Sequence, residues 1–192
     1  MRKIKVGHLG IRHDHSAGKL ECIRKYPEIF ELVGVVAENE QIRSEKADMT
    51  EYSGVKWMTE TELFAVPDLD AVLVEGYELD LVNMGQRCID KGLHIHMDKP
   101  AGADVVAYKK LLMSAKQKNL TVQLAYMYRY NTAVQYCLDL FKSGKLGKLT
   151  GIEAAMGTEH SSDKNKWLEN FQGGIMFFLG CHLVDLLLEK GH

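Results

Sequence analysis

The segment "IKVGHLGIRHDHSAG" (residues 4–18) decides the fold. Apolar residues lead into glycines, as in a strand that feeds a phosphate-binding turn. Gly10 stands where the first glycine of a dinucleotide-binding turn belongs. Arg12 takes the second glycine position, where a side chain crowds the phosphate path although a guanidinium can itself grip a phosphate. Ser16 fits the third position if the loop carries one extra residue, so we interpret the segment as an altered cofactor turn.

The pattern downstream of this segment predicts an α/β domain. Apolar runs at 4–10, 31–38, 55–58, 69–76, 93–97 and 120–126 are expected strands. Helical patterns separate most of them, from Ala17 to near Pro27 and at 41–48, 78–91 and 103–118, while 59–66 is expected to be a turn. Strands that are apolar on both faces and alternate with helices indicate a parallel sheet with right-handed crossovers. Residues 1–124 are therefore predicted to form a doubly wound Rossmann domain.

The regular alternation of strand and helix patterns ends in residues 125–192. Asn131 is a good N-cap for a helix that Gly144 ends, a strand is expected at 148–158, a polar loop at 159–174, and an apolar helix from Ile175 to Glu189. One strand and two helices make no core, so we expect the start of an incomplete α/β substrate and oligomerisation domain. The chain is expected to be a truncation that binds NAD, turns over poorly, and leaves residues beyond about 145 mobile or buried against a partner.

Composition excludes several classes of function. The formal net charge of -2 over 192 residues provides no basic field for nucleic acid. The four cysteines are scattered without zinc-ligand spacing, which favours reduced thiols in the cytoplasm. The longest apolar run, residues 175–188, is too short for a membrane span and contains His182 and Asp185. We expect a cytoplasmic protein without a nucleic-acid or membrane partner.

The residues around the opening turn predict a nucleotide site more than a metal site. Glu38 ends the second predicted strand, where an acidic residue binds the adenosine ribose and disfavours a 2′-phosphate, so NAD is expected over NADP. The backbone from Gly10 through Ile11 and His13, assisted by Arg12, is expected to bind the pyrophosphate. A metal reading would use His8, His13, Asp14 and His15, but no helical spacing supports it. Solvent-facing or phosphate-facing histidines are the preferred interpretation, and no metal is expected.

Four later segments, in order along the chain, resemble one known family. "GLHIHMDKPAG" (92–102) closely resembles the Gly-Lys-His-Val-x-x-Glu-Lys-Pro motif of the glucose-fructose oxidoreductase and inositol dehydrogenase (Gfo/Idh/MocA) family. "YRYNTAV" (128–134) resembles its Arg-Phe-Asn-Pro segment, and "SGKLGKLTGIEA" (143–154) its entry into the second domain. "WLENFQGGIMFFLGCHLVDLL" (167–187) resembles its Gly-Gly-Gly-x-x-x-Asp-x-Gly-x-His-x-x-Asp helix. The match covers the first half of a typical member.

The resemblance implies an NAD- or NADP-dependent oxidoreductase that acts on a secondary alcohol of a sugar, polyol or derivative, and a homo-oligomer at full length. It implies that Lys99 contacts the nicotinamide ribose and the substrate, with Asp98 in place of the usual Glu. It implies that His182 is the general acid or base, a role suited to an imidazole, which titrates near neutral pH. Tyr128 and Arg129 are implied to join His182 in binding the substrate.

The chain departs from the family pattern at two places. The catalytic Asp of the family is Phe178 here, and Asp185, one helical turn beyond His182, is only an ambiguous substitute. The usual Thr-Pro-Asn is replaced near Gly76 and Tyr77, where Tyr77 could stack on the cofactor. Two alternatives to a dehydrogenase therefore stay open. One is a redox-assisted lyase or glycosidase, and the other is a nucleotide- or sugar-binding regulatory protein that has lost catalysis.

Overall fold

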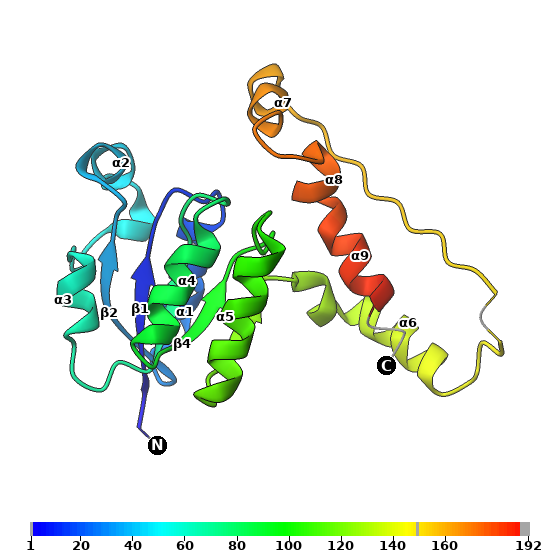
Figure 1. The fold of residues 1–192 in the computed structure, drawn as a ribbon, viewed down its shortest axis with the longest axis horizontal. Helices are drawn as coiled ribbons and strands as arrows, with labels where there is room; N and C mark the ends of the chain where they lie inside the picture. The colour runs from blue at the N-terminus through cyan, green and yellow to red at the C-terminus, as the bar shows by residue number, and fades with distance from the viewer. Residues whose placement is uncertain (1, 149, 189–192) are drawn as a thin grey trace. The chain divides into compact units, whose positions relative to one another are not determined.

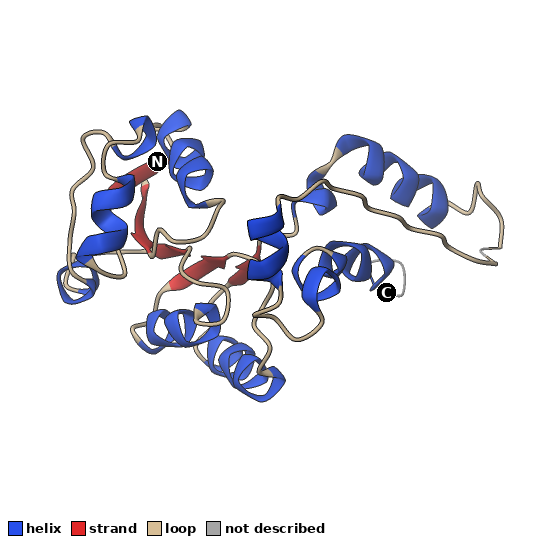
Figure 2. Cartoon of the chain, turned by 90° about the horizontal axis from the view of Figure 1, so that it is seen from above, coloured by secondary structure: helices blue, strands red, loops and turns tan. Residues whose placement is uncertain are grey.

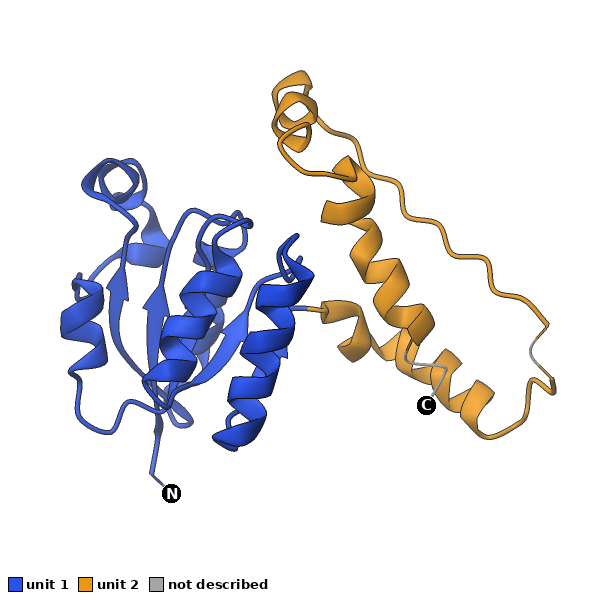
Figure 3. Ribbon diagram, viewed as in Figure 1, with its two compact units in different colours: residues 1–125 blue, residues 126–192 orange. Residues whose placement is uncertain are grey.

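The computed structural model describes residues 2–148 and 150–188. The chain divides into two compact units, Met1–Ala125 and Tyr126–His192, which we call the first and the second unit (Figure 3). Each unit is described separately below.

The first unit is built on a five-stranded sheet in the order β2-β1-β3-β4-β5, with every pair parallel (Figure 1). The strands are β1 (Ile4–Leu9), β2 (Phe30–Val36), β3 (Ala71–Val74), β4 (His94–Met97) and β5 (Val122–Leu124). In the register, Leu9 lies opposite both Val36 and Val74, and Val74 lies opposite Met97. The first four strands therefore end level with one another, so the residues that follow them gather at one edge of the sheet.

Helices lie on both faces of this sheet (Figure 2). The helices of the first unit are α1 (Ser16–Lys25), α2 (Glu40–Lys46), α3 (Glu60–Phe64), α4 (Leu81–Asp90) and α5 (Val105–Gln117), with a 3-10 turn η1 (Thr50–Tyr52). The larger core joins the strands to α3, α4 and α5 through residues such as Leu9, Leu63, Val72, Val74, Leu81, Ile89, Ile95, Met97 and Leu111. A smaller core, Ile11, Leu20, Val35 and Tyr52, lies under α1. The predicted doubly wound Rossmann fold is confirmed.

Two local predictions in the first unit were wrong. Residues 55–58 do not form a strand: they run beside β2 with a single parallel bridge between Val35 and Trp57. The predicted turn after them is helix α3. Its start is fixed by a capping box, in which Thr59 accepts from the amide of Glu62 and the Glu62 carboxylate accepts from the amide of Thr59. The capping box ends the extended segment at Met58, which leaves too few residues for a full edge strand.

The second unit is helical where its secondary structure is regular. Its elements are η2 (Met127–Tyr130), α6 (Thr132–Lys142), α7 (Ser162–Leu168), α8 (Gly174–Phe178) and α9 (Gly180–Leu188). Asn131 caps α6 as predicted, because its side chain accepts from the amides of Ala133 and Val134. In the two units together, residues 2–148 and 150–188 include no helix long and apolar enough to cross a membrane.

Three predictions in the second unit need correction. Residues 150–158 are extended without strand pairing, since a strand needs a neighbour and the described residues beside it offer none. The predicted polar loop contains α7, whose N-cap Ser161 accepts from the amide of Lys164. The predicted final helix is two helices, with the break at Leu179 before Gly180, a residue of low helix propensity. The predicted helix end at Glu189 and residue Leu149 of the predicted strand lie outside the described residues.

The burial of Leu111 of α5 in the larger core yields a stability prediction. Leu111 is fully buried in the larger core, while its neighbour Leu112 is 40% exposed. Leu111→Ala should lower the free energy of unfolding by about 2–5 kcal/mol, because it removes buried methyl groups and leaves a cavity. Leu112→Ala should cost about 1 kcal/mol or less. Urea denaturation of both variants measures the difference, and equal losses would contradict this placement of α5.

Candidate functional site

The candidate site lies at the sheet edge where β1, β3 and β4 end. From β1 the chain crosses to β2 on one side, while β3 and β4 lie on the other, so the strand order reverses between β1 and β3. In open α/β sheets, ligands bind outside the carboxyl ends of the strands at such a switch point. Gly10 follows β1, Glu75 and Gly76 follow β3, and Asp98 follows β4.

Gly10 allows the two central turns to touch. Its φ is +84°, a left-handed conformation that glycine adopts without strain. A Cβ at this position would lie 2.6 Å from both the Cα and the backbone N of Gly76. The amide of Gly10 donates to the carbonyl of Val36, and the amide of Glu75 donates to the carbonyl of Leu9. Only a residue without a side chain fits between the β1 and β3 turns.

Glu38 binds the opening turn directly. Its carboxylate oxygens accept from the amide of Ile11 at 3.1 and 3.2 Å, and one of them accepts from the amide of Arg12 at 3.1 Å. The sequence predicted a pyrophosphate at these amides and a ribose at Glu38. In the structure the carboxylate itself takes both amides, so a phosphate would have to share or displace this contact.

Arg12 and Tyr77 lie together above the turn, as two of the predicted cofactor residues. The guanidinium carbon of Arg12 is 4.3 Å from the centroid of the Tyr77 ring, within cation–π distance. Arg12 is exposed, and it lies beside the turn without filling the gap between Gly10 and Gly76. The structure therefore brings together Gly10, Ile11, Arg12, Glu38, Gly76 and Tyr77.

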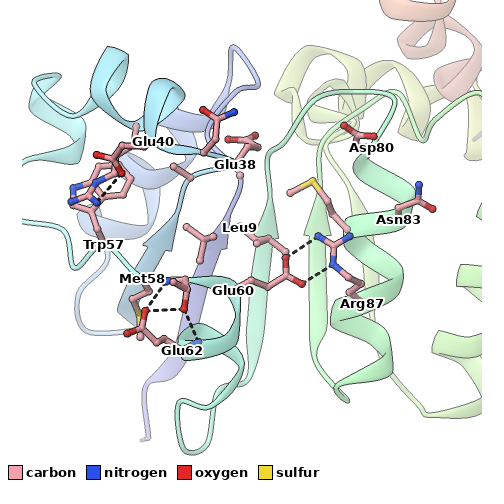
Figure 4. A pocket seen from close by; sticks show the side chains of 17 residues that line it. Leu9, Glu38, Glu40, Trp57, Met58, Glu60, Glu62, Asp80, Asn83 and Arg87 are labelled. Atoms are coloured by element: carbon pink, nitrogen blue, oxygen red, sulfur yellow. Dashed lines mark hydrogen bonds and ion pairs between the residues drawn. The ribbon is translucent and has the colours of Figure 1, made fainter.

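A cavity of about 720 Å³ opens beside Glu38 (Figure 4). Its floor is apolar, formed by residues such as Leu9, Val36 and Met84, and Trp57 lies on its wall with Arg43 above the indole at 5.2 Å. Its rim is mainly acidic, with Glu38, Glu40, Glu60, Glu62 and Asp80 against Arg43 and Arg87. The sequence did not single out Trp57, Arg43 or Asn83, although an indole one residue from the end of an edge segment is a usable signal.

A buried cluster of charged and titratable side chains lies at the carboxyl ends of β3 and β4. Its centre is the fully buried carboxylate of Asp98. One oxygen accepts from the backbone amide of Lys99 at 2.6 Å, and the other accepts from the ammonium of Lys19 at 2.5 Å. Burial alone would raise the pKa of Asp98, but the hydrogen bond from His15 and the charge of Lys19 hold that pKa below its ordinary value. Asp98 is therefore an ionised carboxylate in the interior.

Glu75 shares the ammonium of Lys19 with Asp98. The Lys19 nitrogen lies 2.6 Å from the fully buried carboxylate of Glu75. Burial raises the pKa of Glu75 well above its ordinary value; the Lys19 charge opposes this shift, while the nearby Asp98 charge adds to it. The ends of β3 and β4 are thus joined through one lysine of α1.

His13, a predicted cofactor residue, and His15, named only in the metal reading, have different environments. His13 is buried, and its Nδ1 accepts from the amide of His15 at 3.1 Å while its Nε2 lies 3.5 Å from Glu78. Burial lowers the pKa of His13 to about 4. His15 contacts Asp98 with Nδ1 at 3.1 Å, and its side chain is 46% exposed. The interpretation of His13 as a solvent- or phosphate-facing side chain is wrong, because its ring points into the interior.

The residues whose ligand atoms lie together in the structure differ from those of the metal hypothesis. Ligand atoms of His13, His15 and Asp98 lie within 4.8 Å of one another. His8 instead pairs with Ser16, whose hydroxyl lies 3.0 Å from His8 Nε2 and 2.7 Å from the Tyr52 hydroxyl. Lys19 already places a positive charge on the Asp98 oxygen that a cation would use, and His13 Nδ1 is already a hydrogen-bond acceptor. A cation at this cluster would therefore have to displace contacts that the side chains already make.

In the second unit, His182 lies among aromatic rings. It is 4% exposed, and the rings of Tyr126 and Tyr128 meet it edge-on at centroid distances of 5.8 and 5.1 Å. Both oxygens of Asp185 accept from the guanidinium of Arg129, at 2.5 and 2.8 Å. Asp185 therefore anchors Arg129. The structure thus places Tyr128 beside His182 and Arg129 beside Asp185.

Phe178 has a packing role where the family motif has a catalytic Asp. It is buried, with the Trp167 ring edge-on at 5.0 Å and the Phe171 ring stacked at 6.1 Å. The ammonium of Lys164 lies 4.9 Å from its centroid. The substitution thus joins α7 to α8 through an aromatic core.

The chain is similar to several proteins named as oxidoreductases. No family model matches it. It is 27% identical over 131 residues to an uncharacterized oxidoreductase of Synechocystis, covering 66% of this chain and 35% of that protein. It is 25% identical to the uncharacterized oxidoreductase YhhX of Escherichia coli over 67% of this chain and 37% of that protein. The match thus spans little more than a third of the length of these relatives.

Solved structures support the fold. An NAD-binding protein from Listeria innocua superposes with a TM-score of 0.76 at 19% identity, over 98% of this chain and 53% of that one. Scyllo-inositol dehydrogenase from Lactobacillus casei, solved with NAD(H) and scyllo-inositol, superposes with a TM-score of 0.66 at 22% identity, over 78% of this chain and 44% of that one. A 3-ketoreductase from Actinomadura kijaniata, solved with NADP, superposes with a TM-score of 0.61 at 20% identity, over 74% of this chain and 43% of that one. At these identities the likeness establishes a Rossmann-type fold.

The contact between Gly10 and Gly76 predicts an unequal pair of glycine variants. Gly10→Ala adds a left-handed alanine and a clash with backbone atoms at 2.6 Å, whereas Gly54→Ala adds only the left-handed alanine, since no atom lies within 4 Å of its Cβ. Gly54→Ala should lower the free energy of unfolding by about 1–2 kcal/mol. Gly10→Ala should lower the free energy of unfolding by clearly more than Gly54→Ala, as measured by urea denaturation. Similar losses would mean that the β1 and β3 turns do not touch.

The buried histidines predict a loss of stability in mild acid. Burial lowers the pKa of His8 to about 3, far below its ordinary value of 6.5. Between pH 6.5 and 4 the unfolded chain binds a proton at this residue and the folded chain does not, so its contribution to stability falls as the pH falls. His8→Gln should therefore make the dependence of unfolding free energy on pH shallower, by up to about one proton. Urea titrations across this range measure the slope, and unchanged slopes would contradict a buried neutral His8.

Proposed function

We propose that this chain carries the cofactor-binding part of an NAD-dependent oxidoreductase of the glucose-fructose oxidoreductase and inositol dehydrogenase family. The proposed reaction transfers a hydride to or from a secondary alcohol of a sugar, polyol or derivative. The observation that carries the proposal is Glu38 at the Gly10 turn, beside a cavity of about 720 Å³ at the switch point of a parallel sheet. Named oxidoreductases among the relatives support the same class of reaction.

The residues at the switch point fit a dinucleotide. Gly10 and Gly76 let the β1 and β3 turns meet at the switch point, where a dinucleotide-binding fold places its pyrophosphate. Trp57 and the apolar floor offer a surface for an adenine, and Glu38 offers acceptors for ribose hydroxyls. Arg12 can reach a phosphate from beside the turn. The acidic rim opposes an additional 2′-phosphate, which favours NAD over NADP.

The bound cofactor would supply the hydride acceptor, and the chain would handle the proton. An alcohol loses a hydride readily only when its hydroxyl proton also leaves, so the site needs a base and a cation near the oxygen. Lys99, which follows the buried Asp98 in the first unit, is proposed to stabilise the alkoxide. His182 of the second unit is proposed as a proton acceptor, with Tyr128 and Arg129 binding the substrate.

A second candidate is a nucleotide-binding regulatory protein without catalysis. Phe178 favours it, because a residue packed between Trp167 and Phe171 cannot relay a proton. Calorimetry with NAD⁺, followed by spectroscopic detection of NADH with a panel of polyols and sugars that includes scyllo-inositol, separates the two. Binding with turnover supports the oxidoreductase, and binding without turnover across the panel supports the regulatory protein. Absence of binding contradicts both.

Cofactor choice yields a matched pair of variants. Glu38→Ala should weaken NAD⁺ binding about tenfold or more, a loss of about 1.4 kcal/mol, and should narrow the preference over NADP⁺. Glu40→Ala removes an equal charge from the same cavity without touching the turn, because Glu40 pairs with the exposed Arg43 at 3.3 Å. It should leave the preference nearly unchanged in calorimetry. If both variants shift the preference equally, the selectivity comes from the overall acidic rim and not from Glu38.

A further inference from the structure

His15 combines an exposed imidazole with a fully buried carboxylate. Its ring stands at the start of α1, and its Nδ1 lies 3.1 and 3.3 Å from the two oxygens of Asp98, which follows β4. The His15 side chain is 46% exposed while the Asp98 carboxyl is fully buried. Solvent or a ligand can therefore reach one side of the imidazole, and the other side rests on a charge in the interior.

The state of Asp98 decides which nitrogen of His15 is reactive. An ionised carboxylate has no hydrogen to donate, so it can only accept from His15. The hydrogen of the neutral imidazole is accordingly placed on Nδ1, and Nε2 keeps its lone pair. Nε2 is the nitrogen on the far side of the ring from Asp98. The pair of His15 and Asp98, which we call the dyad, therefore presents a proton acceptor away from the protein interior.

The backbone of His15 is fixed from a second direction. His13 Nδ1 accepts from the amide of His15 at 3.1 Å, and the two rings lie 4.8 Å apart. The amide of His13 in turn donates to the carbonyl of Glu75 at 3.0 Å. A side chain held by packing and by neighbouring hydrogen bonds costs little reorganisation when it reacts. His15 is thus positioned by residues from both the β3 and the β4 ends.

Charged groups from several elements face the Asp98 carboxylate that His15 contacts. Asp98 lies against Nδ1 of His15, and the ammonium of Lys19 lies 2.5 Å from the same carboxylate. Lys19 also contacts Glu75, and His13 lies between Asp98 and Glu78. Charges are costly to bury and are retained chiefly where they serve a function or are fully paired.

From this arrangement we infer that His15 is a proton-transfer residue of the site and that Asp98 is its positioning residue. The inference rests on the proposed oxidoreductase function. In the oxidation direction the O–H bond of the substrate breaks and its proton goes to Nε2 of His15. The C–H bond at the same carbon breaks with its electron pair, which passes as hydride to the nicotinamide of NAD⁺, and the C=O bond forms. The exposed imidazole then releases the proton to solvent. His15 would act from the first unit, beside Lys99.

The first test reads the imidazole itself and needs no substrate. In the chain labelled with ¹⁵N-histidine, His15 should be the Nδ1–H form, and Asp98→Asn should shift it toward the Nε2–H form while circular dichroism stays unchanged. Addition of NAD⁺ should move the His15 Nε2 resonance. A wild-type His15 in the Nε2–H form, or an Nε2 resonance that bound NAD⁺ leaves in place, would overturn the dyad.

The second test separates chemistry from binding. With NAD⁺ and whichever polyol of the panel is turned over, His15→Gln should lower kcat by about two to four orders of magnitude. The dissociation constant for NAD⁺ should stay within about threefold. His94→Gln is the matched control, since His94 is an exposed histidine at the opposite end of β4 and should leave kcat unchanged.

The outcomes distinguish this inference from the function on which it rests. If wild type binds NAD⁺ and turns over, and His15→Gln keeps kcat within about threefold, the dyad is wrong while the oxidoreductase stands. A loss of kcat in His182→Ala alone would identify His182 as the single proton acceptor and would equally refute the dyad. If wild type binds no NAD⁺, the proposed oxidoreductase function and the inference about His15 are both wrong.

Discussion

The ionised carboxylate of Asp98 is the constraint on which the sheet edge depends. A charge removed from water costs several kcal/mol unless partners replace the lost hydration. The partners here come from the following residue, from α1 and from the loop after β1, namely Lys99, Lys19 and His15. The carboxylate can be satisfied only when these three segments have docked. The same requirement draws in Glu75 through Lys19, so the ends of β1, β3 and β4 are held as one assembly.

The regular parts of the first unit could be predicted because their signals are local. β1 becomes buried toward its end, which the sequence expresses as an apolar run, and in the second unit the cap at Asn131 is readable from a single residue. The errors arose where two local signals competed. The extended segment through Trp57 looked like a strand until the capping box of Thr59 and Glu62 ended it. The extended segment at 150–158 marks the other limit, since strand pairing depends on a neighbour that no local pattern can reveal.

The candidate site was predictable in its parts and not in its contacts. Gly10 and Glu38 were predicted because a dinucleotide fold assigns roles to positions after particular strands, and Tyr77 was predicted from the family resemblance. That Glu38 takes the amides of Ile11 and Arg12 is a matter of side-chain reach, and spacing does not encode it. The meeting of His15 with Asp98 joins residues 83 positions apart, and it follows from the register of β1, β3 and β4. Asp185 was similarly ambiguous until its two contacts with Arg129 were known.

The aromatic packing of Phe178 has a consequence for how this sequence could change. An acidic residue at this position would place a carboxylate against the rings of Trp167 and Phe171, at a buried site. The contact of Lys164 with the ring would become a charge pair, but the joint between α7 and α8 would lose its filling. Phe178→Asp would therefore weaken the packing of α8 against α7. An acid would be accommodated at this position only if the neighbouring rings changed with it.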